Sequence, residues 1–171
     1  MIDDDLRAAA ARVLDLCRAR GWTIATAESC TGGLVAGALT DIAGSSDVVD
    51  RGLVTYSNEA KQNLLGVSAE TLRRHGAVSR ETAEEMARGA LSHSPVDLAV
   101  AITGIAGPGG GSAEKPVGLV HFAAAARDGR LIHREKRFGD IGRREVRLRS
   151  VAEALALLEL LASGGRIASL I

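Results

Sequence analysis

A serine placed just before a pair of glycines is the first position in this sequence where chemistry could occur. Ser29 lies in Ala-Glu-Ser-Cys-Thr-Gly-Gly over residues 27–33, between a short β-prone apolar run at 22–27 and a helical pattern. Free amides at a helix start can stabilise an oxyanion or hold a phosphate, and glycines let a substrate approach the backbone. This predicts Ser29 as a nucleophile. The alternative is that Ser29 and Thr31 only cap the helix.

Lys61 is the candidate general base. Ser57 is expected to N-cap a helix over 58–65, which puts Lys61 at the end of its first turn with the side chain leaning back towards Tyr56. A cation is disfavoured near the positive end of a helix dipole, so the pKa of Lys61 could be low enough for it to take a serine proton. Glu59 would oppose this by stabilising the ammonium. The alternative is a solvated surface lysine, with Tyr56 as ordinary sheet packing.

Two further segments could bind an anion. A glycine-rich loop over Gly104–Lys115 follows an apolar run at 97–102, and its amides could face a phosphate or ribose, although a merely flexible loop is equally compatible. Later, Arg143 and Arg147 are four residues apart on an expected helix and could clamp one phosphate. A solvated helix face is the alternative there.

Cysteine and histidine usage argues against redox or metal chemistry. Cys30 is a possible nucleophile in place of Ser29, but no histidine is near it in sequence, and a free cysteine is usually a small buried hydrophobe. Two cysteines are too few for a disulfide framework, and the four histidines have no metal-like spacing. We therefore expect no metal or other cofactor, and a reducing, cytoplasmic location.

Composition bounds the remaining possibilities. At 171 residues and 46% hydrophobic, the sequence predicts a single domain over 1–171, without repeats or linkers. Net charge is zero and aromatic residues make up 2%, which disfavours nucleic-acid or anionic-membrane partners. The start is acidic where a signal peptide would be basic, and no apolar run approaches the ~18 residues of a membrane span.

Hydrophobic periodicity and turn residues predict strands mixed with helices. Helices are expected at 3–20, from 31, at 58–65, after Ser68, after Ser79 and from 140, and strands at 22–27, 51–56, 97–102, 117–126 and 131–138. The last two strands should form a hairpin around Asp128-Gly129. This is typical of an α/β or α+β sandwich with helices packed on a central sheet.

Six blocks of this sequence together resemble the CinA C-terminal-domain family, whose stand-alone members are nicotinamide-nucleotide amidases. The blocks lie at 26–33, 41–46, 54–61, 75–79, 104–108 and 114–118. They follow the family's order and span nearly all of residues 22–120. Other members are fused to an N-terminal molybdopterin-binding-like domain; this chain lacks that domain, and its own Met1 favours the stand-alone form.

The resemblance implies a three-layer α/β/α fold with a mixed, mostly parallel sheet, and hydrolysis of nicotinamide mononucleotide to nicotinate mononucleotide and ammonia without a metal. It implies catalytic roles for Ser29, Tyr56 and Lys61. The expected substrate-binding residues are Glu28, Thr31, Gly32, Gly33, Thr103, Gly104, Gly107 and Arg143. The family's arginine is expected just after Gly139-Asp140, but Ile141-Gly142 intervene here, so Arg143 is the best match and Arg144 or Arg147 stays open.

A homodimer is expected as well. The competing hypothesis is a non-catalytic, nucleotide-binding or regulatory module. In the sequence, only the pairing of Ser29 with Lys61 separates the two, because binding alone would not require it.

Overall fold

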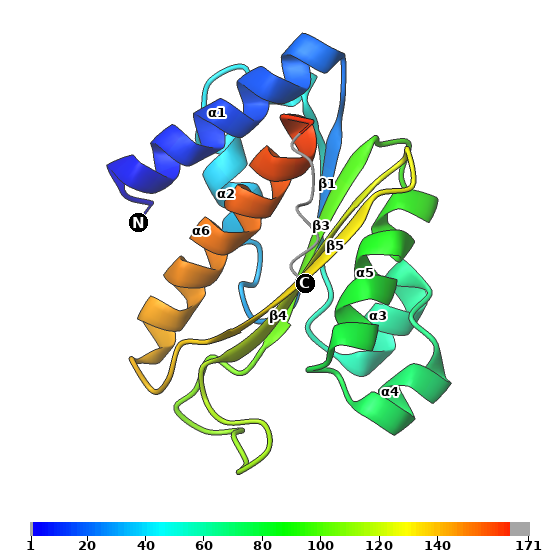
Figure 1. Ribbon diagram of the computed structural model, residues 1–171, viewed down its shortest axis with the longest axis vertical. Coiled ribbons are helices and arrows are strands. Elements are labelled where there is room, and N and C mark those ends of the chain that lie inside the picture. Colours follow the sequence, from blue (N-terminus) through cyan, green and yellow to red (C-terminus); the bar gives the residue numbers. More distant parts are fainter. Residues whose placement is uncertain (1, 165–171) are drawn as a thin grey trace.

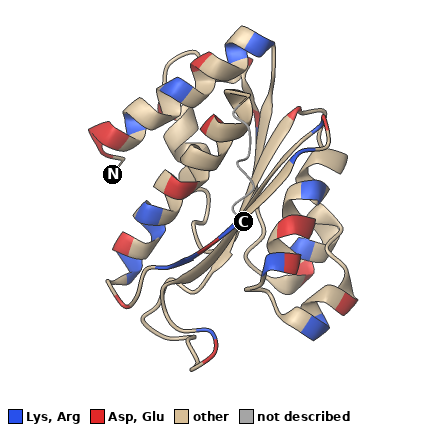
Figure 2. Cartoon of the chain, in the orientation of Figure 1, with Lys and Arg blue, Asp and Glu red and all other residues tan. Residues whose placement is uncertain are grey.

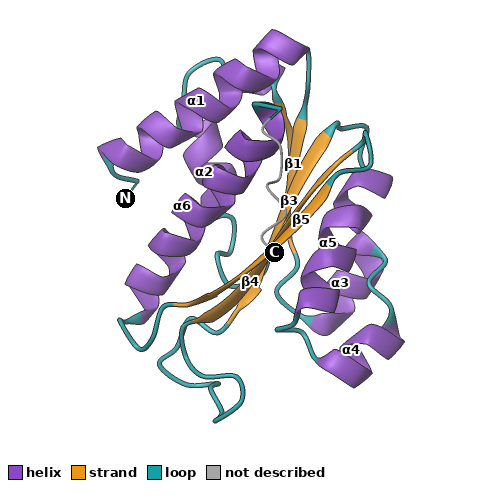
Figure 3. Cartoon of the chain, viewed as in Figure 1, coloured by secondary structure: helices purple, strands orange, loops and turns teal. Residues whose placement is uncertain are grey.

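The computed structural model describes residues 2–164 and has three layers, with a five-stranded sheet between two sets of helices (Figures 1 and 3). One face of the sheet is covered by α1 (Asp4–Arg20), α2 (Leu34–Thr40) and α6 (Arg143–Ala162). The other is covered by α3 (Asn58–Leu65), α4 (Ala69–His75) and α5 (Arg80–Ser92). This confirms the expected α/β/α sandwich. The predicted domain spans 1–171, of which residues 1 and 165–171 lie outside the described part.

The sheet has the order β2-β1-β3-β4-β5. Its strands are β1 (Ile24–Glu28), β2 (Val49–Val54), β3 (Leu98–Gly104), β4 (Leu119–Ala126) and β5 (Leu131–Arg137), and a short 3₁₀ helix, η1 (Ser45–Asp47), precedes β2. β1 is parallel to β2 and β3, whereas β4 is antiparallel to β3 and β5. Only β4 therefore runs against the others, and the sheet is mixed but mostly parallel, as expected.

β3 lies at the centre and is buried on both faces. Leu98, Val100 and Ile102 pack into the core beneath α1 and α6, while Ala99 and Ala101 pack into the core beneath α5. A strand buried on both faces has no solvent side on which to place polar residues. This explains the near-continuous apolar run in the sequence.

Serines begin the three helices on one side of the sheet. The side chains of Ser57, Ser68 and Ser79 each accept a hydrogen bond from the amide three residues further on. Such caps satisfy amides that have no partner within the helix. All three predicted helix starts are confirmed.

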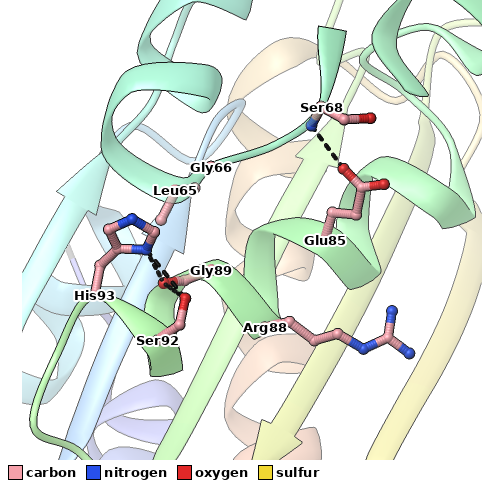
Figure 4. Close-up of a pocket in the computed structure, with 8 residues that line it drawn as sticks. All are labelled: Leu65, Gly66, Ser68, Glu85, Arg88, Gly89, Ser92 and His93. Atoms are coloured by element: carbon pink, nitrogen blue, oxygen red, sulfur yellow. Dashed lines mark hydrogen bonds between the residues drawn. The ribbon is translucent and has the colours of Figure 1, made fainter. Parts of the chain in front are cut away.

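Gly89 sets how closely α3 approaches α5. A Cβ atom built at this position would lie 1.8 Å from the carbonyl oxygen of Leu65, at the end of α3. Figure 4 shows Leu65 and Gly66 directly beside Gly89. Because α3 also carries Lys61, the missing side chain at Gly89 helps to determine where that amine lies.

Charged residues of both signs are mixed along α1, α5 and α6 (Figure 2). This agrees with the balanced count of 21 basic and 21 acidic residues. Among residues 2–164, no helix combines the length and apolar character needed to cross a bilayer.

Candidate active site

Ser29 directly follows β1, where the ends of the parallel strands meet. Its amide donates to the carbonyl of Ile102 on β3 (2.9 Å), and the preceding carbonyl, of Glu28, accepts from the amide of Thr55 (2.8 Å) after β2. The neighbouring strands thus hold the backbone on both sides of Ser29. In open α/β sheets this carboxyl edge is where ligands bind.

Lys61 lies against Ser29. Its Nζ is 3.0 Å from Ser29 Oγ and donates to the carbonyl oxygen of Thr55 at 2.7 Å. Lys61 is only 1% exposed, so the alternative of a solvated surface lysine is wrong. Burial lowers the pKa of its amine, because a charged ammonium loses its hydration there. Within residues 2–164 no carboxylate forms an ion pair with Lys61; Glu59, expected to oppose this effect, is exposed.

Cys30 differs from Lys61 in the effect of burial. Burial disfavours the charged form of a side chain, which is the thiolate for cysteine and the ammonium for lysine. Burial therefore raises the pKa of the Cys30 thiol, to about 12. A thiol is a poor nucleophile until it loses its proton. Ser29, with an amine at hydrogen-bonding distance, is therefore the better-placed nucleophile.

A cavity of about 270 Å³ opens in front of Ser29. It is lined by Ser29, Cys30, Tyr56, Gly104, Ile105, Ala106, Gly107, Gly109, Gly110 and Arg143. The glycine loop after β3 and the start of α6 thus meet the turn after β1, although they are far apart in sequence. The cavity has the Ser29 hydroxyl at one side and the Arg143 guanidinium at another.

Arg143 connects two walls of this cavity. Its Nη2 donates to the hydroxyl of Tyr56 and its Nη1 to the carbonyl of Gly107, both at 2.9 Å. The sequence predicts a contact between Tyr56 and Lys61, but the Tyr56 hydroxyl is bonded to Arg143. Lys61 instead donates to the carbonyl of Thr55, the residue before Tyr56. Tyr56 therefore belongs with the arginine at the exposed end of the cavity.

The three arginines considered at the start of α6 lie in different surroundings. Arg143 lines the cavity, Arg144 is exposed, and Arg147 bonds to the carbonyls of Cys30 and Thr31. Because Nε and Nη2 of Arg147 are already engaged by main-chain carbonyls, Arg143 is the better-placed of the two to meet a phosphate, and the clamp that their spacing suggested stays a prediction.

Glu28 and Thr31 do not line the cavity. The Glu28 carboxylate is buried and accepts hydrogen bonds from the amides of Val35 and Ala36, at 2.9 and 3.0 Å, in the first turn of α2. It therefore caps this helix, and the alternative that Ser29 and Thr31 do so is wrong. A carboxylate shortly before a helix is itself a capping signal, whereas the family resemblance implied that Glu28 contacts the substrate.

Of the expected glycines and Thr103, some line the cavity and others do not. Gly104 and Gly107 line the cavity, whereas Gly32 and Gly33 do not. Thr103 is buried, and its hydroxyl donates to the carbonyl of Ala77 at 2.7 Å, so in this structure it links β3 to the loop before α5.

The amides that could hold an oxyanion differ in part from those expected, at Gly32 and Gly33. The Gly32 amide is already bonded to the Ser29 carbonyl at 3.0 Å. The amides of Cys30, Thr31 and Gly33 donate to no carbonyl within residues 2–164, and those of Cys30 and Thr31 directly follow Ser29. They are the better candidates for this role.

Two other cavities lack a comparable arrangement. One, of about 420 Å³ between α3 and α5, has its polar groups engaged locally: Glu85 accepts from the amide of Ser68, and His93 bonds to the carbonyl of Gly89 (Figure 4). The other, of about 450 Å³, includes His121, whose Nδ1 is 2.9 Å from Nε2 of His133. Neither places a hydroxyl against a buried amine. In the described chain no three His, Cys, Asp or Glu residues are grouped to hold a metal ion.

Comparison with known proteins agrees with this fold. The model of the CinA C-terminal domain matches residues 6–162. The chain belongs to this family. It is 54% identical over 159 residues to nicotinamide-nucleotide amidohydrolase PncC of Escherichia coli K12, covering 92% of this chain and 95% of that protein. It is 55% identical over 139 residues to the protein of the same name from Enterobacter agglomerans, covering 81% and 84%.

A solved structure gives the same result for the fold. The competence/damage inducible protein CihA of Agrobacterium tumefaciens superposes with a TM-score of 0.93 at 58% identity, covering 95% of this chain and 98% of that one. The family expected from six sequence blocks is therefore confirmed over nearly the whole chain.

Proposed function

We propose that this protein hydrolyses the carboxamide of nicotinamide mononucleotide to nicotinate mononucleotide and ammonia, a reaction of pyridine-nucleotide salvage. The observation that carries the proposal is the 3.0 Å contact between the buried Lys61 amine and the Ser29 hydroxyl, which faces a cavity. The two relatives named as nicotinamide-nucleotide amidohydrolases support the substrate.

Acylation begins with neutral Lys61. Its Nζ takes the hydroxyl proton as Ser29 Oγ attacks the carboxamide carbon, which forms a tetrahedral oxyanion. The new ammonium then gives the proton to the amide nitrogen. The C–N bond breaks, ammonia leaves, and an acyl ester on Ser29 remains.

Deacylation repeats these steps with water. Lys61 takes a proton from a water molecule that attacks the ester carbon, and it returns the proton to Ser29 Oγ as the C–O bond breaks. The products are the carboxylate and free enzyme. In both halves, the amides of Cys30 and Thr31 would stabilise the oxyanion.

The other end of the cavity would bind the nucleotide's phosphate. Arg143 is a charged, planar donor at this end, and the amides of the loop from Gly104 to Gly110 are close to it. Charge-assisted hydrogen bonds from arginine to phosphate are among the stronger polar contacts in proteins. Of the other substrate-binding residues predicted from sequence, Glu28 and Thr103 would act by supporting the site's backbone, and Thr31 would contribute only its amide.

The test is ammonia release from nicotinamide mononucleotide by purified, folded protein. We expect one ammonia per nicotinate mononucleotide formed, with the same rate in the presence of EDTA. Loss of activity with EDTA and recovery with a divalent ion would contradict the metal-free chemistry. A folded protein that binds the nucleotide but releases no ammonia would favour the alternative, a non-catalytic regulatory module.

We also propose that the protein works in the cytoplasm as a homodimer. Its free cysteines, Cys17 and Cys30, suit a reducing compartment. Sedimentation of the purified protein would test the dimer, and a monomer at micromolar concentration would contradict it.

A further inference from the structure

Arg147 reaches from α6 to the turn that carries the nucleophile. Its Nε donates to the carbonyl of Cys30 and its Nη2 to the carbonyl of Thr31, both at 3.1 Å. Arg147 does not line the cavity that holds Ser29 and Arg143. Its contacts are therefore with the main chain after Ser29.

Gly32 leaves room for this guanidinium. A Cβ atom at Gly32 would lie 3.3 Å from Nη2 of Arg147, and the residue has a φ of 59°, a conformation that favours glycine. The close approach of Arg147 and the backbone conformation of the turn thus explain why residue 32 is a glycine.

The contact with Thr31 is passed on to Ser29 through one peptide group. The carbonyl of Thr31 and the amide of Gly32 belong to the same planar, trans peptide, so they point in opposite directions. Arg147 bonds to the carbonyl, while the amide donates to the carbonyl of Ser29 at 3.0 Å. Fixing one end of this peptide orients the other.

The same geometry applies to the amide of Thr31, one of the two candidates for holding the oxyanion. The carbonyl of Cys30 shares its peptide with the amide of Thr31, and Arg147 holds that carbonyl. A cationic donor also polarises the peptide and strengthens its amide as a hydrogen-bond donor. Among residues 2–164, Arg147 is the only side chain bonded to either carbonyl.

We propose that Arg147 is a positioning residue, which orients Ser29 and the amide of Thr31 for the reaction and does not bind the substrate. This rests on the proposed amidase function. Because the contact affects the reacting geometry and not the phosphate, its loss should lower kcat and leave KM nearly unchanged.

The experiment compares Arg147→Ala, Arg147→Lys and Arg149→Ala in ammonia release from nicotinamide mononucleotide. Arg149 lies on the same helix, is exposed and bonds only to Glu145 one turn away, so its variant is the matched control. We expect Arg147→Ala to lose about 100-fold in kcat and Arg147→Lys about 10-fold, since lysine keeps the charge but not the forked geometry, with KM within about twofold. Arg149→Ala should match the wild type.

Two outcomes would overturn the assignment. Wild-type kcat in Arg147→Ala would show that the turn needs no support from α6, and a rise in KM alone would make Arg147 a substrate contact. If circular dichroism shows that Arg147→Ala does not fold, the kcat and KM of Arg147→Lys decide by the same criteria. An inactive wild type would instead contradict the amidase function itself, so the two failures can be distinguished.

Discussion

The two ends of the cavity differ in burial. At one end Lys61 lies behind Ser29, outside the cavity lining, where it is 1% exposed and its amine touches Ser29 and a main-chain carbonyl. At the other end Tyr56 is 61% exposed and bonds to Arg143. Burial lowers the pKa of Lys61, whereas arginine keeps its charge in any protein environment. This difference supports the proposal that proton transfer takes place at the buried end and anion binding at the open end.

The proposed roles would explain why a lysine stands at one end and an arginine at the other. A base must lose its proton near neutral pH, which requires the ammonium to be destabilised. A phosphate contact must keep its charge and remain reachable by the ligand. The variants below test whether the two ends are as separate as the structure indicates.

The largest effect is expected at the buried end. Ser29→Ala and Lys61→Arg should each lower kcat by about 10³-fold or more, because one removes the nucleophile and the other puts a permanently protonated group in place of the base. Cys30→Ala is the matched control and should mainly alter packing. Steady-state ammonia release measures all three. Loss in Cys30→Ala with activity retained in Ser29→Ala would move the nucleophile to Cys30.

A smaller and substrate-dependent effect is expected at the open end. Arg143→Ala should lower kcat/KM for nicotinamide mononucleotide by about 10- to 100-fold, since it removes a charge-assisted phosphate contact. Residual turnover of the phosphate-free riboside should barely change. Equal losses on both substrates would place Arg143 in catalysis or folding, and no loss on either would point to the glycine loop.

Substitution of Gly89 tests whether the position of Lys61 depends on the packing of α3 against α5. Gly89→Ala should destabilise the protein by about 1–3 kcal/mol or more, because the added methyl group would overlap the Leu65 carbonyl and push α3 away. It should also lower kcat by displacing Lys61. Gly37→Ala is the control: Gly37 lies in α2 with open space around it, so alanine should stabilise by about 0.5–1 kcal/mol. Urea unfolding measures both, and equal stabilities would contradict the packing argument.

The smallest expected effect is a pH dependence of stability. The folded-state pKa of Lys61 lies below its ordinary value of 10.5, so the unfolded chain binds this proton more readily and stability rises with pH between the two values. Lys61→Met should therefore be more stable than wild type at neutral pH, with the difference shrinking towards pH 10.5. Urea unfolding of both proteins across this range measures it. A constant difference would mean that the amine is not destabilised by burial.

Much of the local structure followed from short-range signals. Ser57, Ser68 and Ser79 were placed correctly at helix starts because an N-cap depends on residues within one turn. The hairpin at Asp128-Gly129 was likewise found from its turn residues. The catalytic and substrate-binding roles themselves stay predictions.

What the sequence by itself determined was the set of elements, the family and the pairing of Ser29 with Lys61. Only the tertiary structure decided which groups each side chain meets. Glu28 accepts hydrogen bonds from amides of α2, and Tyr56 bonds to Arg143, 87 positions away in the sequence. Arg147 donates to a carbonyl in the turn after Ser29. Local periodicity says nothing about such contacts, because they arise where separate strands end at one edge of the sheet and helices pack over it. Burial of Lys61, which lowers the pKa of its amine, is likewise a property of the packed layers.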